Sequence, residues 1–154
     1  MVLGQVPPHA ELLPALGTWA LRRQVLDRVS GRRGRVRGVM EISLELGANG
    51  GGQRWSESGV LRWDGQDHPV TRVLLLRPGA QGAWWVHFAD GRPFHPWRLG
   101  EVVEHPCAAD VYRGRIDVGP RWMTVRWEVS GPCKDQLVAS TYDLLDAAPT
   151  PQQP

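Results

Sequence analysis

The feature that most constrains the fold of this chain is the regular return of glycine, proline and aspartate between short apolar runs. The breaks fall at Ser30-Gly31, Gly47 to Gly52, Asp64-Gly65, Pro78-Gly79, Asp90-Gly91, Gly119-Pro120 and Gly131-Pro132. The runs between them are rich in Val, Ile, Leu, Trp and Thr, a composition typical of β-strands joined by hairpin turns. The sequence therefore predicts an all-β protein.

Apolar and polar residues alternate within these runs, which places them on opposite faces of a strand. From 36 to 46 the even positions are apolar or small, and most odd positions are Arg, Glu or Ser. In the run 54–63, Glu57 shares the apolar face of Trp55, and in the next run Arg72 shares the face of Leu74. Because a buried carboxylate is costly alone, we expect Glu57 to pair with Arg72 inside the protein.

Further strands are expected at 83–88, 93–98, 109–118, 121–130 and 136–144, which makes about nine in all. So many antiparallel strands avoid exposed edges most simply by closing on themselves. We predict a closed, up-and-down, lipocalin-like barrel of about 8–9 strands, preceded by a short helical turn over 12–16. One domain is expected over 1–146, followed by a disordered tail over 147–154.

Composition excludes several classes of protein. No apolar run approaches the roughly 20 residues that a membrane helix needs, and residues 1–15 lack the pattern of a secretory signal, so we expect a cytoplasmic protein. Arginines gather between Arg22 and Arg37 but alternate with valines, as on the wet faces of strands, and the net charge is only +2. We therefore expect no nucleic-acid partner. The two cysteines are too few for a disulfide framework.

The segment between Asp90 and Tyr112 carries most of the candidate chemistry. Asp90-Gly91 predicts a hairpin turn. His95 follows at a strand start, where an imidazole can carry a proton or contact a ligand near neutral pH. Tyr112 falls on the apolar face of the run 109–118, so its phenol is expected inside the barrel.

A metal site is an alternative interpretation of the same segment. His105 and Cys107 lie two residues apart and share a face of an extended chain, and His95 and Asp110 offer further ligands. The close Cys-x-x-Cys or His-x-x-x-His spacing of dedicated sites is absent. We expect neither a resident metal nor another cofactor.

The sequence thus predicts a chamber inside the barrel with Glu57, Arg72, His95 and Tyr112 as its polar lining. The other expected ligand contacts are Trp55, Trp84, Arg92, His105, Asp110 and Trp122. If the chamber is catalytic, the candidate residues are His95, Glu57 and Tyr112.

Several motifs resemble those of known barrels. Gly17-Thr18-Trp19 resembles the Gly-X-Trp signature of lipocalins and other calycins, and this resemblance implies that Lys134 or Arg126 covers Trp19 at one barrel end. From about 13 to 142 the chain is similar to a family of lipocalin-like domains without an established activity. The residues that carry this similarity are Leu16 to Trp19, Glu57-Ser58-Gly59, the DGRxFH motif from Asp90 to His95, His105-Pro106-Cys107 with Asp110 and Tyr112, and Trp127 with the GPxKD motif from Gly131 to Asp135.

Three hypotheses for function follow. The first is binding of a small, partly hydrophobic molecule inside the barrel, by a monomer or a homodimer. The second is an enzyme on the same barrel that moves protons, of isomerase, dehydratase or cyclase type. The third is a structural or partner-binding domain whose barrel is filled by its own side chains.

Overall fold

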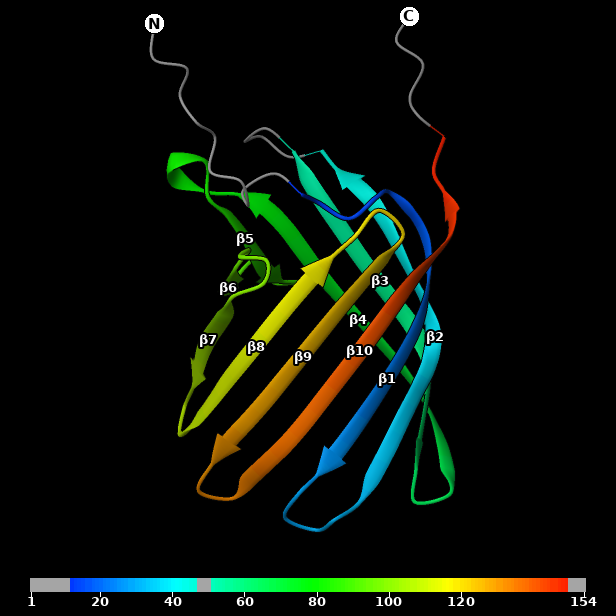
Figure 1. The fold of residues 1–154 in the computed structure, drawn as a ribbon, viewed down its shortest axis with the longest axis vertical. Helices are drawn as coiled ribbons and strands as arrows, with labels where there is room; N and C mark the ends of the chain where they lie inside the picture. The colour runs from blue at the N-terminus through cyan, green and yellow to red at the C-terminus, as the bar shows by residue number, and fades with distance from the viewer. Residues whose placement is uncertain (1–11, 47–50, 150–154) are drawn as a thin grey trace, which may run out of the picture.

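The computed structural model describes residues 12–46 and 51–149, which form a ten-stranded antiparallel sheet curled into a nearly closed barrel (Figure 1). Its strands are β1 (Gly17–Asp27), β2 (Arg33–Glu45), β3 (Gly52–Trp63), β4 (Gln66–Pro78), β5 (Trp84–Phe88), β6 (Pro93–Pro96), β7 (Val102–Cys107), β8 (Asp110–Val118), β9 (Trp122–Gly131) and β10 (Lys134–Ala147). The expected all-β architecture is confirmed. Among the described residues the only helical element is a 3₁₀ turn over Ala80–Gly82.

The barrel departs from the expected one in strand number and in closure. The sheet order is β6-β5-β4-β3-β2-β1-β10-β9-β8-β7, so β6 and β7 form its two edges and do not pair with each other. The strand that the sequence did not predict is β7, which contains Pro106. Proline cannot donate a ladder hydrogen bond, but an edge strand tolerates it because one side of the strand has no partner.

Aromatic side chains bridge the seam between the two sheet edges. Phe94 of β6 stacks on Trp127 of β9 with ring centroids 5.1 Å apart and contacts His105 of β7 edge-on at 5.1 Å. Phe88 stacks on Phe94 at 4.5 Å, and His105 contacts Tyr112 at 6.0 Å. We call these five residues the aromatic seam, and its contacts hold together edges that no hydrogen-bond ladder joins.

The hairpin turns follow directly from local sequence. Asp64 and Gly65 join β3 to β4 with φ values of 50° and 73°. A two-residue turn with both φ values positive suits the twist of the flanking strands, and Asp-Gly is a favoured pair for it. In Figure 1 the β1–β2, β3–β4, β7–β8 and β9–β10 turns lie at one end of the barrel, which we call the hairpin end.

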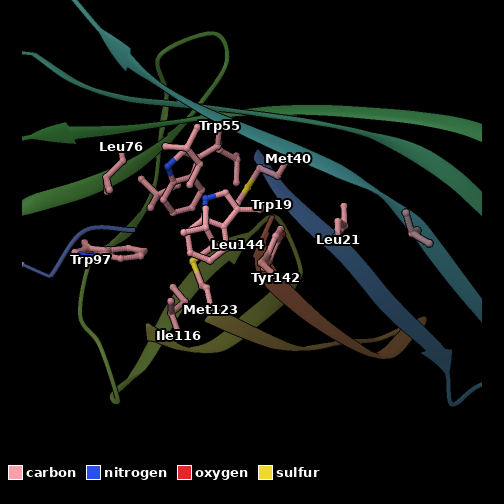
Figure 2. Packing of buried hydrophobic residues seen from close by; sticks show 14 residues of the cluster. Trp19, Leu21, Met40, Trp55, Leu76, Trp97, Ile116, Met123, Tyr142 and Leu144 are labelled. Carbon is pink, nitrogen blue, oxygen red and sulfur yellow. The ribbon is translucent and has the colours of Figure 1, made fainter. Parts of the chain in front are cut away.

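The opposite end, where β1 begins, is closed by tryptophan and the chain segment before it, and we call it the Trp19 end. Trp19 is fully buried, and Figure 2 shows it in one cluster with Met40, Trp55, Met123 and Leu144. Gly17 has a φ of 137°, and a side chain there would collide with the backbone of β10. The glycine of the Gly-X-Trp pattern therefore allows β1 to enter the barrel close to β10.

The expected helical turn over 12–16 is wrong. Residues 12–15 have no regular secondary structure, and their carbonyl groups accept hydrogen bonds from barrel side chains instead. Gln53 Nε2 donates to the Pro14 carbonyl at 2.9 Å, and Trp19 Nε1 donates to the Ala15 carbonyl at 3.0 Å. Because this segment is not part of a helix, its carbonyls are free for such contacts, whereas a helix would use them for its own hydrogen bonds.

The expected covering of Trp19 by Lys134 or Arg126 is also wrong. Lys134 lies at the hairpin end, with its Nζ 6.0 Å from the centre of the Tyr112 ring. Arg126 points outward and pairs with Glu128. The chain segment before β1 takes this place, because Leu13, Ala15 and Leu16 pack against the core around Trp19.

The chain ends are described only in part. Strand β10 extends to Ala147, and the Ala148 amide donates to the Leu16 carbonyl at 3.0 Å, so order continues past the expected boundary at 146. The remainder of the expected tail, 150–154, lies outside the described residues. Within the described part of the chain, no helix is long and apolar enough to cross a membrane.

Candidate functional site

Four polar side chains meet inside the barrel, midway between the Trp19 end and the hairpin end. They are Arg23 on β1, Glu57 on β3, Arg72 on β4 and Tyr142 on β10. Each occupies the inward-facing parity of its strand, and Glu57 and Arg72 lie directly opposite each other in the β3–β4 ladder. We call these four residues the arginine–glutamate cluster.

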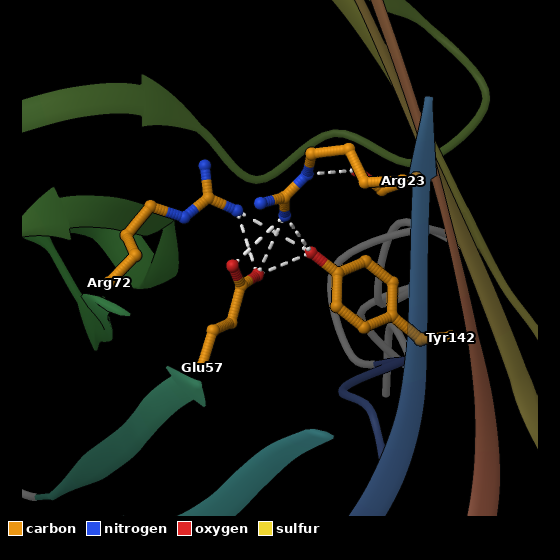
Figure 3. Close-up of polar contacts among 5 residues, drawn as sticks. Arg23, Glu57, Arg72 and Tyr142 are labelled. Carbon is orange, nitrogen blue, oxygen red and sulfur yellow. Dashed lines mark hydrogen bonds and ion pairs between the residues drawn. The ribbon is translucent and has the colours of Figure 1, made fainter. Parts of the chain in front are cut away.

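Glu57 is the centre of this cluster (Figure 3). Arg72 Nη2 donates to Glu57 Oε1 at 2.8 Å, and Arg23 Nη2 lies 2.9 Å from Oε2 and 3.0 Å from Oε1. The Tyr142 hydroxyl donates to Glu57 Oε1 and accepts from Arg23 Nη2 at 2.9 Å. Arg23 Nε donates to Ser140 Oγ at 2.7 Å, which fixes the orientation of that guanidinium. The pairing of Glu57 with Arg72 that the alternation predicts is present.

The cluster keeps Glu57 ionised. Burial alone would raise the pKa of Glu57, but the positive charges of Arg72 and Arg23 outweigh this effect and lower the pKa below its usual value. Burial and the Glu57 charge both raise the pKa of Tyr142, so its phenol stays neutral. Two guanidinium cations therefore face one carboxylate, and the cluster carries a net charge of one positive unit.

A cavity of about 180 Å³ adjoins the cluster. Its apolar lining comes from Leu21, Val36 and Val70, and its polar lining includes Arg23, Glu57 and Arg72. Since water occupies about 30 Å³ per molecule, the cavity has room for about six waters or a ligand head group of that size. Gly59 also borders it, opposite Gly38 in the β2–β3 ladder, and a side chain at either position would collide with the neighbouring backbone.

Arg72 is the cluster residue with spare hydrogen-bonding capacity. Its Nη2 is used by Glu57 and Tyr142, but Nη1 has no hydrogen-bond partner among the described residues. Figure 3 shows Nη1 pointing away from Glu57 and Tyr142. Nε is buried and also lacks a partner in the described part of the chain. The Arg72 side chain is 39% exposed, against 6% for Glu57, so a ligand can reach it.

His95 lies buried on β6 beside the seam. It contacts Phe94 and Trp127 edge-on, and its Nδ1 lies 2.9 Å from the Pro96 carbonyl oxygen. Burial lowers the pKa of His95 from 6.5 to about 4; the Pro96 hydrogen bond opposes this, and the neighbouring His105 and Arg72 add to the lowering. The imidazole is therefore neutral at neutral pH, with Nδ1 protonated and donating to the carbonyl.

Among the described residues no hydrogen bond joins Tyr112 to Glu57 or Arg72, although Tyr112 and His95 both pack against Trp127. Tyr112 does face inward, but it packs against His105 and Trp127. The phenol that contacts Glu57 is that of Tyr142. Strand parity tells which face a residue occupies, but not which inward-facing residues meet across the barrel, and this is why the contact of Tyr142 with Glu57 was not predicted.

The remaining predicted contacts are scattered over the molecule. Trp55 is buried in the core, where its indole contacts Trp97 edge-on at 5.6 Å, and Trp84 packs partly buried against the core. Trp122 is 46% exposed. Arg92 is exposed and pairs with Asp90 at 2.7 Å, and Asp110 lies 4.0 Å from Lys134 at the hairpin end. Their role in ligand binding stays a prediction.

Sequence reasoning missed two cluster residues, Arg23 and Tyr142, and also Ser140, which accepts a hydrogen bond from Arg23. A signal for two of them was present, because Arg23 continues the alternate positions of Trp19 and Leu21, and Tyr142 precedes Leu144 by two. The arginines near Arg23 were instead interpreted together as a wet face. That interpretation holds for Arg35 and Arg37, which are exposed, but not for Arg23.

The alternative metal site does not assemble. Cys107 is exposed on an edge strand, whereas His95 is buried inside the barrel. Within residues 12–46 and 51–149, no group of three or more His, Cys, Asp or Glu side chains has the arrangement of a metal site.

Comparison with known proteins places the chain in a family. The model of a family described as "Family of unknown function (DUF6314)" matches residues 15–144. The chain belongs to this family. All ten strands lie at least partly within the matched range, and so does the whole arginine–glutamate cluster of this DUF6314 member.

A solved structure confirms the kind of barrel that this DUF6314 member forms. It is similar to the S-type phycobiliprotein lyase CPES from Guillardia theta, with a TM-score of 0.62 and 13% sequence identity over 86% of this chain and 89% of that chain. At this identity the likeness shows a shared fold, which is a lipocalin-like barrel. A comparison with curated proteins found no match.

Proposed function

We propose that the barrel binds a small, partly hydrophobic molecule that carries an anionic group, with Arg72 as its principal polar contact. The observation that carries this proposal is the unused side of the Arg72 guanidinium, next to a cavity of about 180 Å³. A guanidinium presents a planar fork of donors that suits a carboxylate or a similar oxyanion.

The charge balance of the cluster supports an anionic ligand. Two guanidinium groups share the single carboxylate of Glu57, so one positive charge has no counterion in the cluster. Partly buried charge without a partner is unfavourable, and a ligand anion would offset it. Neutral Tyr142 orients the carboxylate and the guanidinium groups without changing this balance.

The cavity itself suits the head group rather than the whole ligand. It is smaller than the roughly 300–1,000 Å³ of typical drug-sized sites. Leu61 and Trp63 continue the inward face of β3 toward the hairpin end and are only partly buried. An apolar ligand body would pack there, with the anionic group at Arg72. The similar barrel is a phycobiliprotein lyase, which makes a bilin a reasonable first candidate.

The same geometry favours binding over proton transfer. Glu57 is held as a carboxylate by two arginines and a tyrosine, which makes it a weak base. The pKa of His95, about 4, lies well below the value near ambient pH that suits a general base. Each group is therefore better suited to orienting a ligand than to accepting its proton.

The test uses 8-anilino-1-naphthalenesulfonate, which joins an anionic group to apolar rings, and its uncharged analogue N-phenyl-1-naphthylamine. We expect wild-type protein to prefer the anionic dye, and Arg72→Gln to weaken its binding by about tenfold or more while leaving the neutral dye little affected. Arg77→Gln is the matched control, because Arg77 lies on the same strand but pairs with Glu45 on the outside. Equal binding of the anionic dye by wild type and Arg72→Gln would overturn the proposal. If the expected preference is found, mass spectrometry of molecules that co-purify with the protein would identify the natural ligand.

A further inference from the structure

We propose that the outer face of the barrel, near the hairpin end, binds an acidic segment of a partner protein that also carries apolar residues. A groove of about 450 Å³ crosses the outward faces of β10, β1, β2 and β3 there. It is a different surface from the interior cavity, so this proposal is independent of the function proposed above.

The groove has an apolar side and a cationic side. The pairing of residues between neighbouring strands shows which residues form each side. Leu26 lies between Leu137 of β10 and Arg33 of β2. In the next row toward the barrel middle, Gln24 lies between Ala139 and Arg35, which in turn lies opposite Arg62 of β3. The lining therefore changes from leucine and alanine to arginine across the strands.

The arginines of this groove are incompletely neutralised. Arg62 pairs with Asp67 at 3.2 Å, but Arg33 and Arg35 have no ion pair among the described residues. Arg35 and Arg62 also lie directly opposite each other in the ladder. Like charges in that position are mutually destabilising, and an anion bound between them would relieve the repulsion.

A second groove, of about 370 Å³, adjoins the first and shares Arg35 and Arg62 with it. It extends the basic surface to Arg37 of β2, and it also reaches Asp67 of β4. Together the grooves span five strands, which at about 4.8 Å per spacing is about 19 Å, the length of about six extended residues. That extent suits a polypeptide segment better than a small molecule.

The lining also favours an acidic peptide over a nucleic acid. Asp64 and Asp67 lie within the grooves and would repel a phosphate backbone, which is charged at every nucleotide, whereas a peptide can place uncharged residues beside them. Neither groove is lined by an aromatic side chain on which a base could stack. An acidic segment can place its carboxylates at Arg33 and Arg35 and its apolar side chains on Leu26 and Leu137.

The experiment measures fluorescence anisotropy of a fluorescein-labelled peptide of about 12 residues, built from Glu, Leu and Ser, a length chosen to exceed the span of the grooves. Such a peptide is too large for the interior cavity. We expect it to bind wild-type protein, more weakly as salt rises, and a peptide with Gln in place of Glu to bind at least about tenfold more weakly.

Two variants of the protein separate the sides of the groove. The double variant Arg33→Glu and Arg35→Glu should lose at least about tenfold in affinity, and Leu137→Ser should lose less at low salt but retain the salt dependence. Arg98→Glu is the control, since Arg98 is exposed on the connection between β6 and β7, away from the grooves. All of these positions are at least partly exposed, so the variants should fold.

The outcomes distinguish the proposal from its rivals. Equal affinity of wild type and the double variant for the acidic peptide, or no binding by wild type, overturns it. Binding of labelled single-stranded or duplex DNA that depends on Arg33 and Arg35, without binding of the acidic peptide, overturns the assignment of the partner in favour of a nucleic acid.

Discussion

At the Trp19 end the barrel interior is filled by fully buried Trp19, Met40, Leu76 and Met123, whereas midway to the hairpin end it holds two arginines around one carboxylate. The first region is stabilised by apolar burial, which does not depend on pH or on a partner charge. The second is stabilised only while each charge keeps its partners. The comparison shows how one barrel separates a region that secures the fold from a region that can recognise a ligand.

The largest effect is expected from Trp19→Ala. Removing this fully buried indole leaves a cavity at the closed end and should lower the free energy of unfolding by about 4 kcal/mol. Urea denaturation measures it, with Trp122→Ala as the control, because Trp122 is 46% exposed and should cost less than about 1 kcal/mol. Similar costs for the two variants would contradict the role of Trp19 as the core of that end.

Glu57→Gln should come next, at about 3 kcal/mol, because it leaves Arg23 and Arg72 without a counterion inside the barrel. The matched change Glu45→Gln breaks a more exposed ion pair with Arg77 and should cost less than about 1 kcal/mol. The ratio of the two losses, measured by urea denaturation, tells whether burial makes the cluster different from a surface pair.

His95 should make stability depend on pH. Its pKa is lowered in the folded protein from 6.5 to about 4, so as pH falls through this window the unfolded chain takes up a proton that the folded protein does not. Stability should therefore decrease by about 3 kcal/mol between pH 6.5 and pH 4. His95→Gln should flatten that part of the profile, whereas exposed His68→Gln should not. The pKa of Glu57 is also lowered in the folded protein, so the stability that its carboxylate contributes should be lost at still lower pH.

Tyr142→Phe should have a smaller effect, of about 1 kcal/mol, since Glu57 loses one hydrogen-bond donor but keeps both arginines. Loss of this donor should also raise the pKa of Glu57, so acid unfolding should begin at a higher pH than in wild type. An acid unfolding curve identical to that of wild type would show that the phenol does not contribute to holding the carboxylate ionised.

The smallest effect is expected from Lys134→Met, within about 0.5 kcal/mol. Lys134 lies at the hairpin end, partly exposed, and covers no part of Trp19. Urea denaturation measures this change. A loss of unfolding free energy as large as that of a core substitution would restore the idea that Lys134 covers Trp19. It would also remove the distinction between the two ends.

Much of the fold was predictable because it depends on local sequence. Asp64-Gly65 specifies its turn by backbone conformation alone, and the alternation in β2 and β3 specifies which side chains face inward. Strand β7 was missed because Pro106 opposes a strand, and only its edge position makes a strand possible there. The segment 12–16 was wrongly predicted as helical because local sequence does not reveal its contact with Gln53, which lies 39 positions from Pro14.

The candidate site was predictable only in part, for a similar reason. Glu57 and Arg72 lie on neighbouring strands joined by a short turn, so their pairing follows from register. Arg23 and Tyr142 reach the same carboxylate from β1 and β10, and 119 positions separate them in the chain.

By itself, the sequence determined that this chain forms antiparallel strands and which of their residues face inward. It also determined that Glu57 and Arg72 pair on adjacent strands. Each of these features follows from the two-residue period of a strand and from the turns. Only the tertiary structure decided how the barrel curls, where it stays open, and that Tyr142 rather than Tyr112 meets Glu57. Those features depend on which inward-facing side chains approach across the interior. Sheet curvature sets that distance, and no local pattern in the chain encodes it.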